Sequence, residues 1–252
     1  MTDQKTLAYI NLYAVLGTLE NLCELVPEAR ELVKTKKPIS IAFDVKGGPN
    51  ATITFKNGRC RMEQGVGKCD VKLPFSSCEK FNGLIDGTTT PIPSKGFAHL
   101  GFLLKKFTPL TDMLSSYMQP EPAALEDPAF FEISTTLMFY TISVALAQIA
   151  NNDKVGQFSA DHMVDGEIGF AMRGGPAATL RVKDHRVLTY KRPSENPRAS
   201  MTFASIQLAR DLFDSKVNAV ACIGDGSIEM KGMISMLDNL NRLLDRVALY
   251  LA

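Results

Sequence analysis

The residues that could do chemistry are few and do not form a recognisable catalytic pattern. The chain has three histidines, His99, His162 and His185, and none lies at metal-ligand spacing from another candidate ligand. Asp161 precedes His162 and Asp184 precedes His185. Residues adjacent in sequence rarely direct both side chains at one substrate, so neither pair indicates acid–base catalysis. We therefore expect no metal centre, no cofactor and no enzymatic activity.

The cysteines and one serine also favour structural roles. Five cysteines are present, namely Cys23, Cys60, Cys69, Cys78 and Cys222. Cys60, Cys69 and Cys78 are nine residues apart, which matches no usual zinc pattern, so reduced thiols in a cytoplasmic protein are the simpler interpretation. Ser77 and Lys80 imitate the Ser-x-x-Lys of acyl-serine enzymes, but no partner motif follows, and the serine is well placed to cap a helix.

A glycine turn that occurs twice organises the rest of the chain. Lys46-Gly47-Gly48-Pro49 returns 127 residues later as Arg173-Gly174-Gly175-Pro176. Glycine adopts positive φ without a steric penalty, and proline fixes its own φ, so each motif predicts a tight turn between two strands. Hydrophobic positions before the turn repeat at the same shift, and Leu84-Ile85-Asp86 corresponds to Leu212-Phe213-Asp214 downstream. The sequence therefore predicts two copies of one unit of about 120 residues each.

Composition narrows the class of protein. With 252 residues, of which 45% are hydrophobic, the chain is able to bury a substantial core. The net charge of +1 gives no broad basic surface for nucleic acid. The first residues lack a basic stretch followed by an apolar run, so we expect no signal peptide.

Hydrophobic periodicity predicts the elements of the first half. In order, we expect helices at 4–25 and 28–34, strands at 39–45, 51–56, 59–64 and 70–75, a helix beginning at Ser76 or Ser77 and ending at Ile85, a short strand after Gly96 and a helix near 102–117. Ser76 and Glu79 have capping-box spacing. Pro91 and Pro93 interrupt the stretch before the last strand and should disturb that edge of the sheet.

A proline-rich stretch and then a second series of elements follow. We place the domain boundary there, giving domains 1–120 and 121–252. Residues 129–150 form the most apolar segment, for which a buried helix is favoured over a membrane span, because Glu132 and Gln148 interrupt it. After it we expect strands at 166–172, 177–183, 186–191 and 200–203, a helix at 205–214, strands near 219–223 and 226–231 and a helix at 233–251.

This order of elements resembles the sterol carrier protein type-two family, present as two tandem copies. Asp70-Val71-Lys72-Leu73 and the helix after it are similar to the strand–helix signature of that family, as are Ala199–Phe203 and the helix through Asp211. Gly226–Gly232 resembles its last strand. The resemblance implies an α+β fold of two modules, each a mainly antiparallel sheet covered by helices, related by a pseudo-two-fold axis. It also implies an apolar tunnel for sterol, fatty acid or acyl-CoA.

The residues expected to line such a tunnel are apolar and lie on the strands and helices of this signature. In the second copy they are Phe203, Leu208, Leu212, Phe213, Met230, Met233, Met236 and Leu237; in the first they are Phe75, Phe81 and Leu84. Methionine adapts to varied ligands, although core packing is favoured over ligand contact for any single one of these residues. Because prolines interrupt the first copy, we expect the second copy to be the better lipid site.

Alternatives from other classes of protein stay open. The chain could be an accessory or interaction protein with filled pockets, assembling with a partner or as a homo-oligomer. Lysines at 34, 36 and 37, or at 105 and 106, could make transient contact with a membrane surface, although runs this short are usually only solvated. A pocket of about 300 Å³ or more lined by apolar side chains would favour lipid binding, and a solid core would favour the accessory role.

Overall fold

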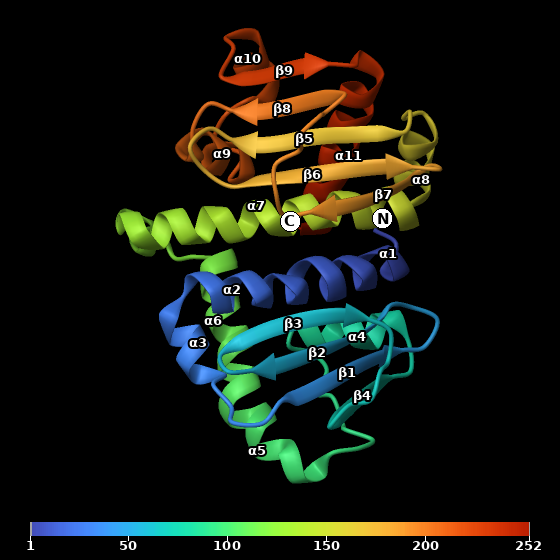
Figure 1. Ribbon diagram of the computed structural model, residues 1–252, viewed down its shortest axis with the longest axis vertical. Helices are drawn as coiled ribbons and strands as arrows, with labels where there is room; N and C mark the ends of the chain where they lie inside the picture. Colours follow the sequence, from blue (N-terminus) through green and yellow to red (C-terminus); the bar gives the residue numbers. More distant parts are fainter. Residues whose placement is uncertain (1, 252) are drawn as a thin grey trace. The chain divides into compact units, whose positions relative to one another are not determined.

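The computed structural model describes residues 2–251 and shows an α+β protein (Figure 1). Its contacts divide the chain into two compact units, Met1–Leu137 and Met138–Ala252. The division falls within helix α7 (Pro128–Asn152), whereas the sequence places a boundary at 120/121; that boundary stays a prediction. Each unit contains one mixed sheet with helices and is described by itself below.

Unit 1 begins with a long helical segment, as predicted for residues 4–25. Its parts are α1 (Gln4–Tyr9), a π-helical stretch η1 (Ile10–Val15), a 3₁₀ turn η2 (Leu16–Thr18) and α2 (Leu19–Leu25), and α3 (Pro27–Leu32) follows. The side chain of Asp3 caps the start by accepting a hydrogen bond of 2.8 Å from the backbone N–H of Thr6. One face of this segment supplies the leucines of the unit 1 core.

The sheet of unit 1 has the order β3-β2-β1-β4. Its strands are β1 (Ile39–Val45), β2 (Asn50–Lys56), β3 (Arg59–Gln64) and β4 (Val71–Phe75). Neighbouring strands are antiparallel except β1 and β4, which are parallel. Gly47 makes the β1–β2 turn with a φ of +73°. Helix α4 (Cys78–Ile85) follows β4, and its cap is Ser77, which accepts from Lys80 N–H; Ser76 does not make this cap.

The short strand predicted after Gly96 is absent. Only one bridge, between Lys72 and Lys95, extends the sheet beyond β4. Pro91 and Pro93 lie in the irregular stretch before that bridge, where two backbone donors are missing. Helical turns then follow directly: η3 (Phe97–His99), α5 (Leu100–Phe102), η4 (Leu103–Phe107), α6 (Thr108–Met118) and η5 (Pro122–Glu126).

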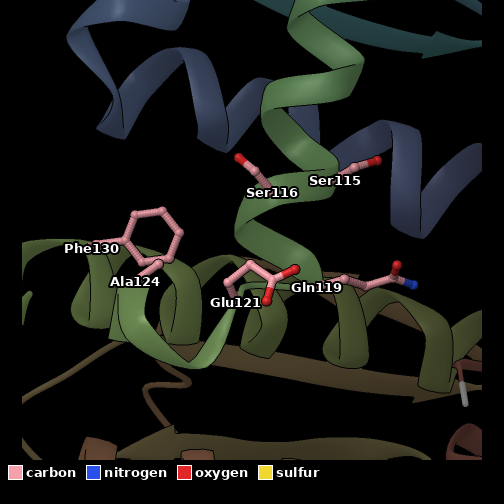
Figure 2. Close-up of a pocket in the computed structure, with 6 residues that line it drawn as sticks. All are labelled: Ser115, Ser116, Gln119, Glu121, Ala124 and Phe130. Atoms are coloured by element: carbon pink, nitrogen blue, oxygen red, sulfur yellow. The ribbon is translucent and has the colours of Figure 1, made fainter. Parts of the chain in front are cut away.

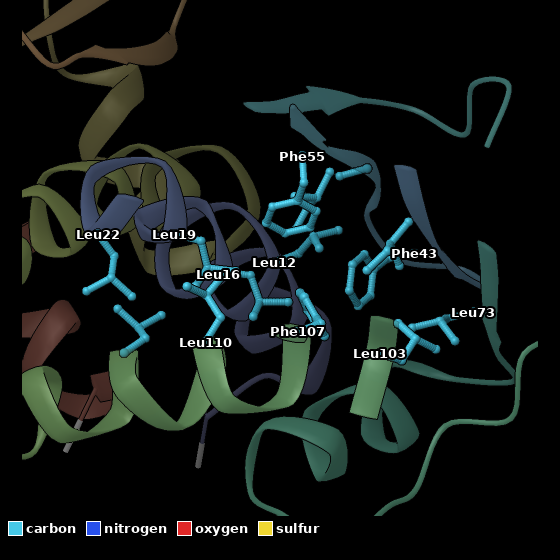
Figure 3. Close-up of a cluster of buried hydrophobic side chains, with 14 of the residues drawn as sticks. Leu12, Leu16, Leu19, Leu22, Phe43, Phe55, Leu73, Leu103, Phe107 and Leu110 are labelled. Atoms are coloured by element: carbon cyan, nitrogen blue, oxygen red, sulfur yellow. The ribbon is translucent and has the colours of Figure 1, made fainter. Parts of the chain in front are cut away.

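The core of unit 1 lies between the N-terminal helical segment, the sheet and the helices after Gly96. Figure 3 shows Phe43 and Phe55 of the sheet facing Phe107, with leucines of the N-terminal segment beside Leu110. The Phe43 and Phe107 ring centroids are 6.1 Å apart, and those of Phe55 and Phe107 are 6.1 Å apart. Aromatic side chains thus fill the space between sheet and helices.

Unit 2 has a five-stranded sheet with the order β7-β6-β5-β8-β9. Its strands are β5 (Gly166–Met172), β6 (Ala177–Lys183), β7 (Arg186–Tyr190), β8 (Ala199–Phe203) and β9 (Ile228–Gly232). Its further helices are α8 (Lys154–Asp161), α9 (Ile206–Phe213), α10 (Ala219–Gly224) and α11 (Ile234–Leu251). The prediction of a strand near 219–223 is wrong, since these residues form α10. Helix α8 was not predicted.

The two sheets share several local features. The first three strands of each are antiparallel neighbours, and the fourth pairs in parallel with the first, β1 with β4 and β5 with β8. Gly47 and Gly174 have φ of +73° and +72° in the corresponding turns. Gly96 and Gly232 have φ of +90° and +94°, and a Cβ on either would overlap a backbone carbonyl oxygen. The chain therefore makes the same close approach at the same edge of each sheet.

Helix α7 is long and apolar enough to cross a membrane by length and composition, and it is the one such helix found in residues 2–251. Within the structure, 67% of its most apolar window is buried. Its second half packs on the unit 2 sheet: Phe139 stacks on Phe170 at 4.9 Å, and the Asn151 amide bonds both the N–H and the carbonyl of Val187. These contacts are those of a helix that covers a sheet.

Candidate ligand-binding site

An apolar hollow of ≈ 390 Å³ lies in unit 2, where α10, β9 and the start of α11 meet. It is lined by Ile223, Met230, Gly232, Ile234, Leu237, Asp238 and Asn241. Four of these side chains are apolar, while Asp238 and Asn241 supply polar groups at one side. Pockets that hold small molecules begin at about 300 Å³ and combine an apolar lining with few polar groups. The hollow has a volume and a lining of this kind, and it is an open depression on the surface rather than an enclosed tunnel.

A glycine forces the sharp bend that shapes the hollow. Gly232 ends β9 with a φ of +94°, and a Cβ there would overlap the carbonyl oxygen of Arg198. Only glycine tolerates both this φ and this approach. The chain then enters α11 within two residues, which places Ile234 and Leu237 beside Met230 on the adjoining strand.

Helix α10 forms the opposite wall because its N-terminus is strongly capped. The side-chain oxygen of Asn218 accepts hydrogen bonds from the N–H groups of Val220 and Ala221, at 2.9 and 3.1 Å. These bonds satisfy two donors that a helix start otherwise leaves free. The cap holds the β-branched residues Val220 and Ile223 in a helix, and Ile223 faces the hollow.

Large apolar side chains that line the hollow, or lie close in sequence to those that do, are exposed. Val220 is 77% exposed and Ile234 is 82% exposed, while Ile223 and Met233 are each 38% exposed. Large apolar side chains gathered at a hollow mark a surface that binds something apolar, whereas scattered ones need no special reason. An apolar ligand would cover side chains that otherwise face water.

The charged groups around the hollow are paired with one another. Lys231 lies 2.6 Å from Glu229, and Arg242 lies 3.1 Å from Asp238. The hydrogen bond and charge of Lys231 hold the pKa of Glu229 below its ordinary value, so this carboxylate is ionised at neutral pH. Lys231 on β9 and Asp238 in the lining therefore each have an oppositely charged partner.

Helix α11 is anchored at its far end by a buried ion pair. Asp153 accepts from Arg246 at 2.6 Å and from the Tyr250 hydroxyl at 2.7 Å, and its other oxygen caps α8 through Val155 and Gly156. Burial raises the pKa of Asp153, but the hydrogen bonds from Arg246, Tyr250 and Gly156 outweigh it, so the net pKa lies below the usual value. This anchor fixes the helix that carries Leu237.

The predicted ligand residues of unit 2 divide into three groups. Met230 and Leu237 line the hollow, and Met233 lies exposed on the same turn. Phe203 and Met236 are buried in the core. The α9 residues Leu208, Leu212 and Phe213 are half-buried away from the hollow, and the Phe213 ring packs edge-on against Phe203 at 6.2 Å. Whether any of them contacts a ligand stays a prediction.

The predicted residues of unit 1 belong to its packed core. Phe81 is fully buried, and its ring centroid lies 5.2 Å from that of Phe75 and 6.2 Å from that of Phe43. Leu84 is partly buried and packs against this cluster. The corresponding position on α9, counted from the capping serines Ser77 and Ser205, holds Ala209. The fourth residue after the capping serine is therefore a phenylalanine in unit 1 and an alanine in unit 2.

Sequence reasoning missed several residues of the hollow. Ile223, Ile234, Asp238 and Asn241 line it but were not predicted. Ile223 was placed on a strand rather than on a helix, so its position relative to β9 was wrong. The apolar spacing of Ile234 and Leu237 on the closing helix was a usable signal for that wall.

The residues weighed for catalysis do not converge. His185 lies 4.0 Å from Asp161, with both side chains largely exposed, and His162 contacts the Phe158 carbonyl. All five cysteines are free, as expected, and Ser77 caps α4, as predicted. Within residues 2–251, no group of three or more His, Cys, Asp or Glu side chains could hold a metal ion.

A second hollow of ≈ 400 Å³ lies in unit 1 between α6, η5 and α7. Figure 2 shows its lining residues: Ser115, Ser116, Gln119, Glu121, Ala124 and Phe130. Four of the six are polar, and the Phe130 ring is stacked on Tyr117 at 4.4 Å. This lining offers no continuous apolar wall, so the hollow in unit 2 is the better candidate for an apolar ligand.

Comparison with models of known families gave no match to this sequence. Comparison with curated proteins gave none either. Among solved structures, the sterol carrier protein domain 2 of Helicoverpa armigera is 21% identical with a TM-score of 0.35, over 43% of this chain and 87% of that one.

Two further solved structures are also sterol carrier protein domains. The UbiJ-SCP2 ubiquinone synthesis protein is 15% identical with a TM-score of 0.35, over 44% of this chain and 95% of that one. The apo form of sterol carrier protein 2 from Yarrowia lipolytica is 16% identical with a TM-score of 0.32, over 46% and 89%. Each of these likenesses covers less than half of this chain.

Proposed function

We propose that this chain binds an apolar small molecule of the sterol, fatty acid or acyl-CoA type in the hollow of unit 2, and that it does so without catalysis. The observation that carries the proposal is the ≈ 390 Å³ hollow with Ile223, Met230, Ile234 and Leu237 in its wall. Its size exceeds the threshold of about 300 Å³ that favours a ligand site over a filled core. We further propose that the protein is cytoplasmic and that it transfers such a ligand as well as binding it.

The size of the hollow suggests modest affinity. A chain of about eight methylenes gains roughly 6 kcal/mol gross on burial. Association costs at least about 4 kcal/mol, so the net affinity is weak unless polar groups add to it. Asn241 is the polar group that could donate to a ligand headgroup, since Asp238 already pairs with Arg242 and a carboxylate would repel an anionic headgroup. We expect broad selectivity among apolar chains.

Unit 1 supports a different role. Its aromatic core, which includes Phe81, is filled. We propose that the two units are copies of one module, supported by their shared strand order and by the matching glycines 96 and 232. In this proposal the first copy acts as an accessory module and the second as the binding module, as the prolines at 91 and 93 led us to expect.

Mass spectrometry of organic extracts tests this function directly. Protein purified without detergent should take up a fluorescent fatty acid in solution, and its extracts should be enriched in an apolar compound even where weak binding leaves only part of the sites filled. A chain that carries nothing and takes up none of several fatty acids, sterols and acyl-CoAs would favour the accessory role for both units.

A further inference from the structure

The segment after Gly96 has both buried and exposed apolar side chains. Phe102, Leu103 and Phe107 are buried and face the unit 1 core (Figure 3 shows Leu103 and Phe107). In the same run of 3₁₀, α- and π-helical turns, Phe97 is 61% exposed, Leu100 is 37% exposed and Leu104 is 69% exposed. We call these three exposed residues the outer stripe. Ile92, 75% exposed, precedes them. The fold of unit 1 does not use this outer stripe.

Basic side chains lie next to the Leu104 end of the outer stripe. Lys105 follows Leu104 and is exposed, and the ammonium of Lys106 lies 2.6 Å from the carbonyl of Leu32 and 3.5 Å from that of Lys34. These contacts bring the second lysine run beside the first, so that the exposed Lys36 and Lys37 join the same region. Two runs that are short in sequence thus become one basic cluster in the fold.

Little acidic charge offsets this cluster. Glu31 pairs with Lys34 at 2.9 Å. Within the described residues, Lys36, Lys37 and Lys105 make no ion pair. The exposed apolar residues of unit 2 differ, because Lys231 and Arg242 beside them are each paired with an acid. Unpaired lysines beside an apolar stripe therefore distinguish the unit 1 surface.

We propose that this surface of unit 1 docks on an anionic phospholipid bilayer. Phe97, Leu100 and Leu104 would enter the boundary between headgroups and acyl chains, and the lysines would contact anionic headgroups. An apolar stripe edged by lysines is the pattern of helices that lie on membranes. Each lysine near an anionic surface strengthens binding about fivefold at low salt. The proposal does not depend on ligand binding in unit 2.

Flotation of the full-length chain with vesicles tests the docking. Protein should float with phosphatidylcholine vesicles that contain phosphatidylserine, much less with phosphatidylcholine alone, and less as salt rises. The variant F97S/L104S should bind at least tenfold more weakly. K36E/K37E should also lose at least tenfold, whereas K46E makes the same kind of charge change at the other end of β1 and should bind as the unmodified chain does.

Controls separate docking from misfolding and from self-association. Phe97 and Leu104 are exposed, so circular dichroism and the thermal midpoint should not change in F97S/L104S. M230D, which alters the unit 2 hollow, should still bind vesicles. Equal binding to neutral and anionic vesicles would overturn the proposal. A second outcome would also overturn it: the unmodified chain does not bind vesicles but forms a dimer, and F97S/L104S is a monomer. In that case the outer stripe contacts a second copy of the chain.

Discussion

Placing a carboxylate in the wall of the hollow should abolish ligand uptake and leave the fold intact. Met230 is the best position, because it lines the hollow from β9 and is only half-buried. Met236, chosen from sequence as a tunnel residue, is fully buried, so an aspartate there would unfold unit 2 rather than test the site. We therefore choose Met230→Asp.

The expected loss follows from desolvation. A ligand chain that enters the hollow must displace water from the new carboxylate, and an unpaired buried charge costs several kcal/mol. Since each 1.4 kcal/mol is a factor of ten, about 3 kcal/mol weakens binding roughly a hundredfold. That loss would remove most of an affinity that we expect to be weak. Lys231 already pairs with Glu229, so no free cation on β9 would rescue the aspartate.

The assay is fluorescence titration with a fatty acid probe, with circular dichroism as the test of folding. Leu188→Asp is the matched control, because Leu188 is 52% exposed and lies on β7, the opposite edge strand of the same sheet. It should bind the probe as the unmodified chain does. Unchanged uptake by a folded Met230→Asp variant would refute the placement of the site, and equal loss in both variants would refute its specificity.

Three further variants test the fold that positions the site. Asp153→Asn keeps a capping side chain but breaks the pair with Arg246, and chemical denaturation should show a loss of roughly 2–4 kcal/mol. The folded pKa of Asp153 lies below its ordinary value, so its contribution is present above the ordinary pKa and is lost as the pH falls through the folded pKa; acid unfolding of the variant should depend less on pH there. Gly232→Ala should destabilise unit 2 more than Gly226→Ala, which shares a positive φ but has open space for a Cβ. Phe81→Ala should cost about 3–5 kcal/mol; a loss of less than about 1 kcal/mol would contradict a filled core.

Much of the framework could be predicted because local signals agreed with one another. The glycine turns, the alternating strands and the helix caps each carry their own physical reason, and Gly47 and Gly174 have the positive φ that their sequence requires. The strand predicted near 219–223 failed because Val220 and Ile223 favour strands, while the Asn218 cap decides for a helix. The side chain of Asn218, which precedes the segment, thus outweighed the preference of Val220 and Ile223 for a strand.

The hollow could not be predicted in the same way. It depends on the distance between α10, β9 and α11, which no short stretch of sequence encodes. Met230 and Leu237 were found because they are apolar and lie on the last strand and helix, but Met236 has the same character and is buried. The sequence identifies the elements that carry the site, and packing decides which side of each element faces the space.

The incomplete edge of the unit 1 sheet affects how this protein behaves at high concentration. The outward N–H and carbonyl of Lys72 on β4 are bonded to Lys95 and Ser94, at 3.1 and 2.9 Å. Pro74, two residues further, points its backbone the same way and has no N–H to offer. An unfolded or neighbouring chain that approaches β4 therefore finds no row of donors on which to add a strand. The irregular stretch before Gly96, which forms no further strand, therefore also protects the β4 edge from pairing with another chain.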